Sequence, residues 1–227
     1  MSEFNEEAPS KEREKQRIIN VYFVRHAEAS YKGRDDKDGT LTESGKIQAE
    51  QAGRQMFEQI SDGVIKFYSS PLGRSQETAQ IIRQVVEDEI LKSGKDVKVL
   101  SGSIRDKQNL VSIDILTDEY WQLRRAGVRD PVQHWLSHSQ ESPQEALKVF
   151  EDLVEHFKKL SSRLSPNGPN LHLVCVTHGG NPELFLKKVT GLEHLPDLDN
   201  CEVIKLNFAQ TPESKTKVVY RGNEYTV

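Results

Sequence analysis

The chain has 227 residues, of which 35% are hydrophobic and 29% are charged, so it is ordinary for a globular protein and long enough to bury a substantial core. Its 31 basic and 35 acidic residues give a net charge of −4, which argues against a surface that binds nucleic acid. No apolar run approaches the ~20 residues that a membrane span needs, and the polar N-terminus lacks the apolar segment of a signal peptide.

Both cysteines, Cys175 and Cys201, fall in apolar runs, and this placement predicts free thiols rather than a disulfide framework. Free thiols are typical of proteins in a reducing compartment. We therefore expect a cytoplasmic protein with no membrane partner and no nucleic-acid partner.

The beginning of the chain predicts a tail, a strand, a loop and a helix. Residues 1–17 are dense in Glu, Lys and Arg, which predicts a charged, disordered tail. An apolar, β-branched run from 18 to 24 predicts a buried strand, and the polar residues from 29 to 39 predict a loop beside an active site. Thr42 is suited to cap a helix whose apolar residues recur at helical spacing up to Ile60.

The next stretch predicts a strand, a helix and a short strand. Residues 64–68 form the second apolar run, and Pro71 suits the first turn of a helix that ends at Gly94. Residues 96–100 predict a short third strand near a sheet edge. Residues 101–141 are less regular, and we interpret them as an inserted cap over the sheet.

The C-terminal part predicts two helices and three strands. The sequence Ser-Pro-Gln-Glu at 142–145 is typical of a helix start. Residues 171–176 predict a strong strand, followed by a helix capped by Asn181. Residues 201–208 and 217–220 predict closing strands, which an antiparallel arrangement would suit.

Strands that alternate with helices predict an α/β fold. We expect a three-layer sandwich with a mostly parallel central sheet, helices on both faces and a small inserted cap. Residues 18–227 would then form a single domain, with the cap at about 101–141.

Three of the predicted strands end in polar residues suited to one task. The first ends in Arg25 and His26, the second runs into a segment with Arg74, and the late strand ends in His178 and two glycines. Because the carboxyl ends of parallel strands share one edge, these residues should meet. Arginine binds phosphate oxygens through a planar fork, and a glycine-rich helix start adds N–H donors. The set predicts a site for a dianionic phosphoryl group, where a neutral imidazole could attack phosphorus and a carboxyl group could protonate the leaving oxygen.

Four short motifs follow one another between residues 18 and 181. They are Arg25-His26-Ala27-Glu28, the segment 41–49 (Leu-Thr-Glu-Ser-Gly-Lys-Ile-Gln-Ala), the segment 69–79 (Ser-Ser-Pro-Leu-Gly-Arg through Thr-Ala), and His178-Gly179. Together they resemble the histidine phosphatase superfamily, in its phosphoglycerate-mutase-like branch 1, which usually has glycine where this chain has Ala27. Four ordered matches are much more specific than any one short motif.

The resemblance implies a role for each residue at the strand ends. His26 would be the nucleophile that carries the phosphoryl group as a phosphohistidine. Arg25, Arg74 and His178 would form the phosphate pocket, and His178 would also take part in catalysis.

The family's acid/base carboxylate follows the third strand, and Asp106 is the best match to it. Asp106 departs from the family in being shorter than the usual glutamate. If Asp106 is not the acid, Glu119 and Asp114 in the cap are the next candidates. Lys32 stands where mutase-like members often carry an asparagine, and Lys32 and Lys107 are candidate substrate-binding residues.

The resemblance implies a phosphoric-ester hydrolase that acts through a phosphohistidine on a phosphorylated small molecule or a phosphoprotein, without a cofactor. A phosphoglycerate-mutase-like transfer and a non-catalytic phosphate- or phosphoprotein-binding module are the alternatives. His134 and His138 are four residues apart and could pair on a metal, but no third ligand lies near them in the sequence, so we expect no metal site. The loop at 30–39 and the cap at 101–141 should determine the substrate.

Overall fold

The computed structural model describes residues 17–31, 39–107, 110, 122, 126–128, 134, 142–192, 197–208 and 215–227. Most of the predicted tail and cap lie outside these residues, as does the loop that contains Lys32. The alternative acids Glu119 and Asp114, and His138 of the suggested metal pair, lie outside them too.

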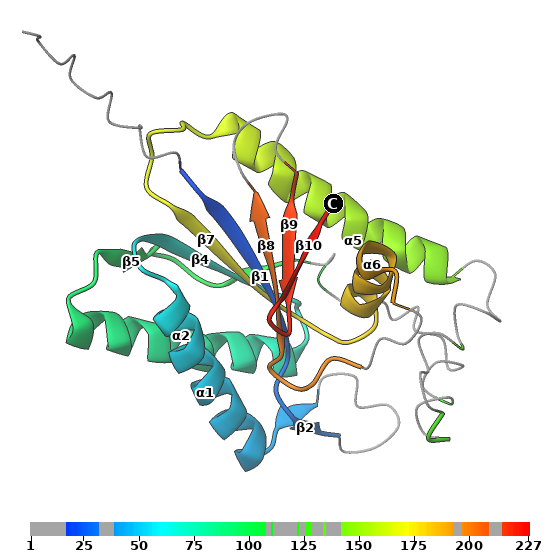
Figure 1. Cartoon of the computed structure of the whole chain (residues 1–227). Coiled ribbons are helices and arrows are strands. Elements are labelled where there is room, and N and C mark those ends of the chain that lie inside the picture. The colour runs from blue at the N-terminus through cyan, green and yellow to red at the C-terminus, as the bar shows by residue number, and fades with distance from the viewer. Residues whose placement is uncertain are drawn as a thin grey trace, which may run out of the picture.

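An eight-stranded sheet forms the centre of the molecule, in the order β10-β9-β8-β1-β7-β4-β5, with β6 beside β4 (Figure 1). Five strands run parallel to one another: β1 (Ile19–Arg25), β7 (Leu171–Thr177), β4 (Gly63–Ser69), β5 (Val97–Val99) and β6 (Arg105–Asp106). Three antiparallel strands complete the other side: β8 (Val203–Phe208), β9 (Lys217–Tyr220) and β10 (Asn223–Thr226). The α/β fold with a mostly parallel central sheet is therefore confirmed.

Helices cover both faces of this sheet, which gives the three predicted layers (Figure 1). One face carries α1 (Glu43–Gln59) and α2 (Gly73–Ser93), and the other carries α5 (Ser142–Arg163) and α6 (Asn181–Thr190). In the described part of the chain, no helix is both long and apolar enough to span a bilayer.

The side chains of β1 alternate between the two layers, because successive residues of a strand point to opposite faces. Val21 and Phe23 belong to the core that α5 and α6 cover, where the rings of Phe23 and Phe150 lie 4.6 Å apart. Tyr22 and Val24 belong to the core shared with α1 and α2. Burial on both faces explains why this strand is an almost continuous apolar run.

The predicted start of the first helix is confirmed. Thr42 caps α1, and its side-chain oxygen accepts a hydrogen bond from the Gly45 N–H at 2.9 Å. The first two residues of the predicted loop at 29–39 form a short strand instead, β2 (Ala29–Ser30), which pairs antiparallel with β3 (Thr40–Leu41) just after the loop.

The predicted start of α2 is wrong by two residues. Pro71 was expected in the first helical turn, but α2 begins at Gly73 with Leu72 as its N-cap. The Leu72 N–H donates to the Ser70 hydroxyl at 3.2 Å, so the chain is still in a tight turn at Pro71. The proline therefore shapes the exit from β4, whereas the helix begins after it.

The predicted cap of α6 is wrong by one residue. Asn181 is the first residue of the helix, and Gly180 is the N-cap with a φ of 106°. Only glycine adopts this conformation readily, so the second glycine of the late motif is a backbone requirement. Glu183 supplies the capping group, because its carboxylate accepts the Gly180 N–H.

The last strand, β10, was not predicted. It pairs with β9 through a two-residue turn, Arg221-Gly222, and its residues are mostly exposed and polar. A strand without an apolar face leaves no alternating pattern to detect. The expectation of free thiols is confirmed, with Cys175 buried and Cys201 half-buried.

Candidate active site

Three parallel strands end at the same level, and their register places the motif residues side by side. Arg25 of β1 lies opposite Thr177 of β7, and the His26 N–H donates to the Thr177 carbonyl at 2.8 Å. On the other side of β7, the Ser70 N–H donates to the Val176 carbonyl at 3.0 Å. His26, Ser70 and the residue after Thr177 therefore project from one edge of the sheet.

The hydrogen bonds of His26 determine which ring nitrogen carries the proton. The ring is buried, with 7% of its residue surface exposed. Nδ1 lies 2.7 Å from the Ala27 carbonyl oxygen, which can only accept, so Nδ1 carries the proton. The Arg74 Nε–H donates to Nε2 at 3.1 Å, so Nε2 presents its lone pair. His26 is thus held in the tautomer that leaves Nε2 as the nucleophilic atom.

Arg74 lies in the first turn of α2 and is only 8% exposed. The ring of Tyr31 lies 5.6 Å from its guanidinium carbon, a cation–π distance. Thr78, one turn further, accepts the Ala27 N–H at 3.1 Å and donates to the Arg74 carbonyl at 2.7 Å. This hydroxyl ties the start of the helix to the residue that follows His26.

Ala27 fits its position without strain, although the family usually has glycine there. It is fully buried among the side chains of the α1/α2 core, and it is not one of the residues with a positive φ. Glycine is needed for a positive φ or for an approach closer than a Cβ allows, and the Ala27 Cβ is accommodated here at an ordinary φ. The departure from the family motif therefore leaves the geometry of the loop intact.

His178 lies beside His26, with the two ring centroids 5.0 Å apart in an edge-to-face arrangement. Its Nε2 lies 2.7 Å from the Ser70 hydroxyl and 3.2 Å from the Ser75 hydroxyl. Its Nδ1 is buried and has no hydrogen-bond partner among the described residues. Nδ1 is therefore the ring nitrogen of His178 whose hydrogen bond is not made among the described residues.

The charge state of His178 follows from its surroundings. Burial lowers the pKa of its imidazole well below the usual value, and electrostatic interactions with His26, Arg74 and Arg25 lower it further. His178 is therefore neutral near pH 7. A neutral ring adds no repulsion to the two arginines and can donate one hydrogen bond.

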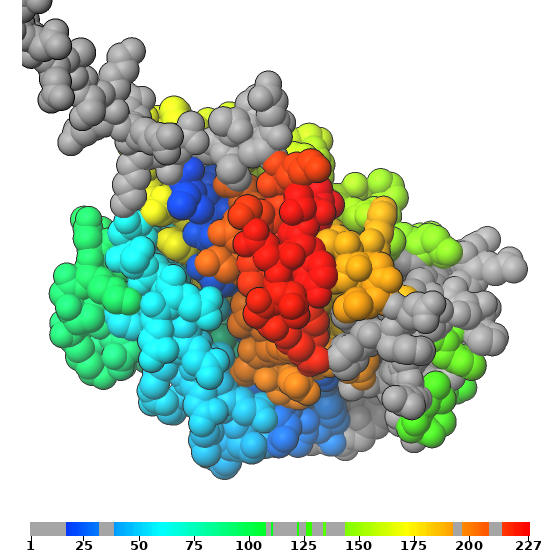
Figure 2. All heavy atoms as spheres, viewed as in Figure 1, coloured from blue at the N-terminus to red at the C-terminus, as the bar shows by residue number. Residues whose placement is uncertain are grey.

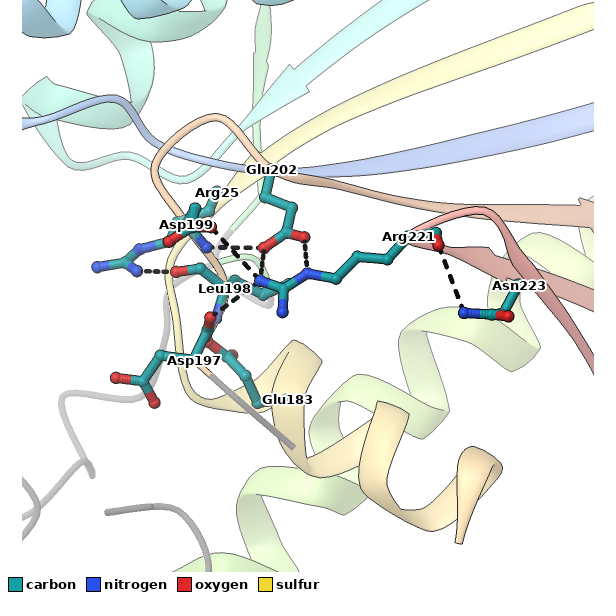
Figure 3. Close-up of polar contacts among 8 residues, drawn as sticks. All are labelled: Arg25, Glu183, Asp197, Leu198, Asp199, Glu202, Arg221 and Asn223. Atoms are coloured by element: carbon teal, nitrogen blue, oxygen red, sulfur yellow. Dashed lines mark hydrogen bonds and ion pairs between the residues drawn. The ribbon is translucent and has the colours of Figure 1, made fainter. Parts of the chain in front are cut away.

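Arg25, the last residue of β1, reaches the pocket from the other side. Its Nη1–H donates to the carbonyl oxygen of Leu198 (Figure 3). Its Nε is buried and has no hydrogen-bond partner among the described residues. One side of the guanidinium is thus held by the protein, and Nε is a buried donor that a phosphoryl oxygen would satisfy.

Behind Arg25 lies a buried carboxylate, that of Glu183, which is 1% exposed. It accepts the Leu198 N–H at 3.1 Å and also the Gly180 N–H. Burial raises its pKa, while the charge of Arg25 and these hydrogen bonds act in the opposite direction. A Cβ on Gly179 would lie 3.1 Å from the Glu183 carboxylate and 3.6 Å from the Arg25 Nε, so the first glycine of the motif allows this close approach.

The sequence-predicted acid lies on the short strand beside β4. Asp106 ends β6 and lies opposite Ser69 of β4, so its backbone is at the carboxyl edge of the sheet. Its side chain is exposed and accepts a hydrogen bond from Gln76 at 3.0 Å. Lys107 places its ammonium 5.7 Å from the centre of the Tyr68 ring. The structure therefore brings His26, Arg74, Arg25 and His178 together and leaves Asp106 and Lys107 beside them.

Sequence reasoning missed several residues that hold the site together. Ser75 is inside a motif already noted, and the need of a buried His178 for a partner could have identified it. Glu183 stands three residues after Gly180, which is the spacing of a capping carboxylate. Tyr31 gave no signal, because a single aromatic residue in a polar loop has many explanations. Among the described residues, no group of three side chains could hold a metal ion.

Comparison with known proteins agrees with the motifs. Residues 21–94 match the family model of the histidine phosphatase superfamily (branch 1). Over 202 residues the chain is 26% identical to a probable phosphoglycerate mutase, GpmB, of Escherichia coli, an alignment that covers 86% of this chain and 87% of the relative.

Solved structures share the fold. A phosphoglycerate mutase from Bacillus anthracis superposes with a TM-score of 0.61 at 16% identity, covering 93% of this chain and 96% of the other. A mycobacterial glucosyl-3-phosphoglycerate phosphatase in complex with VO3 superposes with a TM-score of 0.55 at 17% identity, covering 90% and 99%. At these identities the likeness concerns the fold alone.

Proposed function

We propose that this chain, which belongs to the histidine phosphatase superfamily (branch 1), is a phosphoric-ester hydrolase that works through a phosphohistidine on His26. The observation that carries the proposal is the geometry of His26: its Nδ1–H donates to the Ala27 carbonyl at 2.7 Å, and its Nε2, which accepts the Arg74 Nε–H at 3.1 Å, is the ring nitrogen without a proton. A pocket that only bound phosphate would have no need of a nucleophile held in one tautomer.

The reaction proceeds in two displacements. Nε2 of His26 attacks phosphorus, an N–P bond forms, and the P–O bond to the ester oxygen breaks while a carboxylic acid protonates that oxygen. Water then attacks phosphorus, the N–P bond breaks, and the carboxylate takes the proton from the water. Arg25, Arg74 and His178 stabilise the charge on the equatorial oxygens in both steps. Asp106 is the candidate acid, because it lies at the same sheet edge, on the strand next to β4.

Replacement of the nucleophile tests the mechanism. We expect His26→Ala to lower phosphatase activity by at least about 10³-fold, because removing a nucleophile removes the covalent route. The measurement is phosphate release over a panel of sugar phosphates, nucleotides and phosphopeptides. His156→Ala, which removes an exposed imidazole on α5, is the matched control and should keep full activity. A folded His26→Ala protein with wild-type activity would refute the phosphohistidine mechanism.

Two other functions remain open to experiment. A mutase is supported by the names given to the Escherichia coli relative and to the Bacillus anthracis structure, and a phosphate-release assay run beside a phosphoglycerate-isomerisation assay separates the two activities. A non-catalytic phosphate- or phosphoprotein-binding module would show neither activity and would trap no phosphoryl group on His26. The substrate we expect is a phosphorylated small molecule or a phosphoprotein in the cytoplasm.

A further inference from the structure

Arg221 occupies an unfavourable place in the turn between β9 and β10. Its φ is 46° and that of Gly222 is 77°, so both central residues of this two-residue turn are in the left-handed region. Such turns favour Asn-Gly or Gly-Gly, because a long side chain is disfavoured there. An arginine held in this conformation indicates that its side chain makes contacts that offset the strain.

The guanidinium of Arg221 makes those contacts to one short segment of chain (Figure 3). Nε and Nη2 bind the two carboxylate oxygens of Glu202 at 2.5 and 2.8 Å, a bidentate pair. Nη2 also lies 3.4 Å from the Asp197 carbonyl oxygen and 3.5 Å from an Asp199 carboxylate oxygen. The hydrogen bond with Glu202 is the main reason that the pKa of Arg221 is raised. One side chain therefore connects the C-terminal hairpin to the segment 197–202.

Segment 197–202 is folded directly against the Arg25-His26 pair. The Cys201 N–H donates to the Arg25 carbonyl at 3.0 Å, and the Arg25 N–H donates to the Glu202 carbonyl at 3.1 Å. The side-chain amide of Asn200 donates to the His26 carbonyl at 3.1 Å. In the space-filling view, the red hairpin of β9 and β10 covers this side of the molecule and borders the orange residues that precede β8 (Figure 2).

Leu198 is the point at which the segment reaches the side chain of Arg25. Its carbonyl oxygen accepts from the Arg25 Nη1–H, and its own N–H donates to Glu183 at 3.1 Å. The peptide of Leu198 is therefore held between a buried carboxylate and the pocket arginine. Any shift of segment 197–202 would move the acceptor that orients the Arg25 guanidinium.

We propose that Arg221 is a positioning residue: by binding Glu202 and Asp199 it fixes segment 197–202, and through the Leu198 carbonyl it orients Arg25 toward a bound phosphoryl group. The proposal rests on the proposed function in one respect, the use of Arg25 as a phosphate ligand. It adds a chain of contacts that runs from Arg221 through Glu202 and Leu198 to Arg25.

If the ion pair of Arg221 and Glu202 only stabilised the fold, its loss would lower stability without changing the affinity of the pocket for an oxyanion. The Arg221 side chain is 37% exposed and that of Glu202 is 16% exposed, so loss of this ion pair should lower stability somewhat but leave the fold intact. Its planar fork binds both oxygens of Glu202, and a lysine cannot reproduce that geometry. The effect should therefore appear in the affinity of the pocket for an oxyanion, with arginine better than lysine and lysine better than glutamine.

The first test compares Arg221→Gln and Arg221→Lys with Lys217→Gln. Lys217 is the matched control, because it forms an exposed ion pair with Glu224 at 2.7 Å in the same hairpin but does not touch segment 197–202. We expect Arg221→Gln to weaken the binding of inorganic phosphate and orthovanadate about tenfold and Arg221→Lys to weaken it less, with no change for the control. A lowered melting temperature with unchanged oxyanion affinity would show a structural role only and overturn the proposal.

A double-mutant cycle with Arg25→Ala tests the route of the effect. If Arg221 acts through Arg25, then Arg221→Gln has no further effect on phosphate affinity once the Arg25 side chain is gone. Losses that multiply in the double variant would show a different route and contradict the proposal.

A third readout is independent of turnover and of ligand. The ¹⁵N–¹H signal of the Arg25 Nε–H should shift or broaden in Arg221→Gln and stay in place in Lys217→Gln. If the wild-type protein hydrolyses no ester but this signal responds, the proposed function fails while the positioning role stands. If the wild type is an active phosphatase and the signal does not respond, the positioning role fails alone.

Discussion

Arg74 and Arg25 lie at the same pocket, but the protein positions them in different ways. Arg74 is carried by the first turn of α2, its carbonyl is bonded to Thr78 one turn away, and its side chain contacts His26 directly. Arg25 is the last residue of a strand, and its guanidinium is bonded to the carbonyl of Leu198, 173 positions away in the chain. One arginine is placed by a local helix, and the other by a loop that depends on the C-terminal hairpin.

Because of this difference, the positions of the two arginines should respond differently to substitutions elsewhere in the chain. A helix is stabilised by its own backbone hydrogen bonds, so the Arg74 side resists substitutions outside α2. The Arg25 side depends on side-chain contacts of segment 197–202 with Arg221 and Glu183. Substitutions far from the pocket should therefore affect substrate binding through Arg25 and leave Arg74 in place.

Of the two arginines, Arg74 should show the larger effect. We expect Arg74→Ala to lower kcat/KM about 10²- to 10³-fold, because it removes a preorganised donor to the phosphoryl oxygens and also the partner of the His26 Nε2. The measurement is steady-state kinetics on the best ester from the phosphatase screen. Arg83→Ala is the matched control, because Arg83 lies on the same helix and pairs with Glu87. A loss for Arg74→Ala no larger than that for Arg221→Gln would show that the helix side is not dominant.

His178 lies beside His26, and its protonation state depends on electrostatic interactions with both Arg74 and Arg25. In the unfolded chain its pKa should be near the ordinary ~6.5, whereas burial and electrostatic interactions with His26, Arg74 and Arg25 depress it in the folded protein. The unfolded state therefore binds more protons below pH 6.5, so the stability due to the neutral ring is present above pH 6.5 and lost as the pH falls.

Urea unfolding at several pH values measures this effect. The free energy of unfolding of the wild type should fall from pH 7.5 to pH 5, by at most about 1.4 kcal/mol per pH unit for one group. His178→Gln should show a shallower fall, and His156→Gln, which replaces an exposed imidazole on α5, should follow the wild type. Equal pH slopes for the wild type and His178→Gln would contradict the placement of a depressed pKa at His178.

The sequence was most informative where the contacts are local or follow from strand order. His26 and His178 could be predicted to meet because parallel strands end at one edge, and the register of β1 and β7 confirms that they do. Arg74 could be predicted because strand and helix are joined by a short turn. The contacts that hold the Arg25 guanidinium could not be predicted. They depend on the position of Leu198 and on a turn that contains Arg221, and no sequence pattern links these residues to Arg25. A motif match predicts the place of a residue in the fold better than the contacts of its side chain. Asp106 lies at the predicted edge of the sheet, but its side chain is bonded to Gln76.

The smallest expected effect concerns a residue that belongs to a family motif without touching the pocket. The Thr42 hydroxyl accepts the Gly45 N–H at 2.9 Å and donates to the Glu28 carboxylate at 2.7 Å, so it caps α1 and ties it to the loop after His26. We expect Thr42→Ala to cost about 1 kcal/mol in the free energy of unfolding, the usual cost of a lost N-cap, with phosphate affinity within twofold of wild type. Ser44→Ala, an exposed position in the same turn, is the control for urea unfolding and phosphate binding. A large loss of phosphate affinity in a folded Thr42→Ala protein would mean that α1 also positions the pocket, and the helix side would then depend on distant contacts as the Arg25 side does.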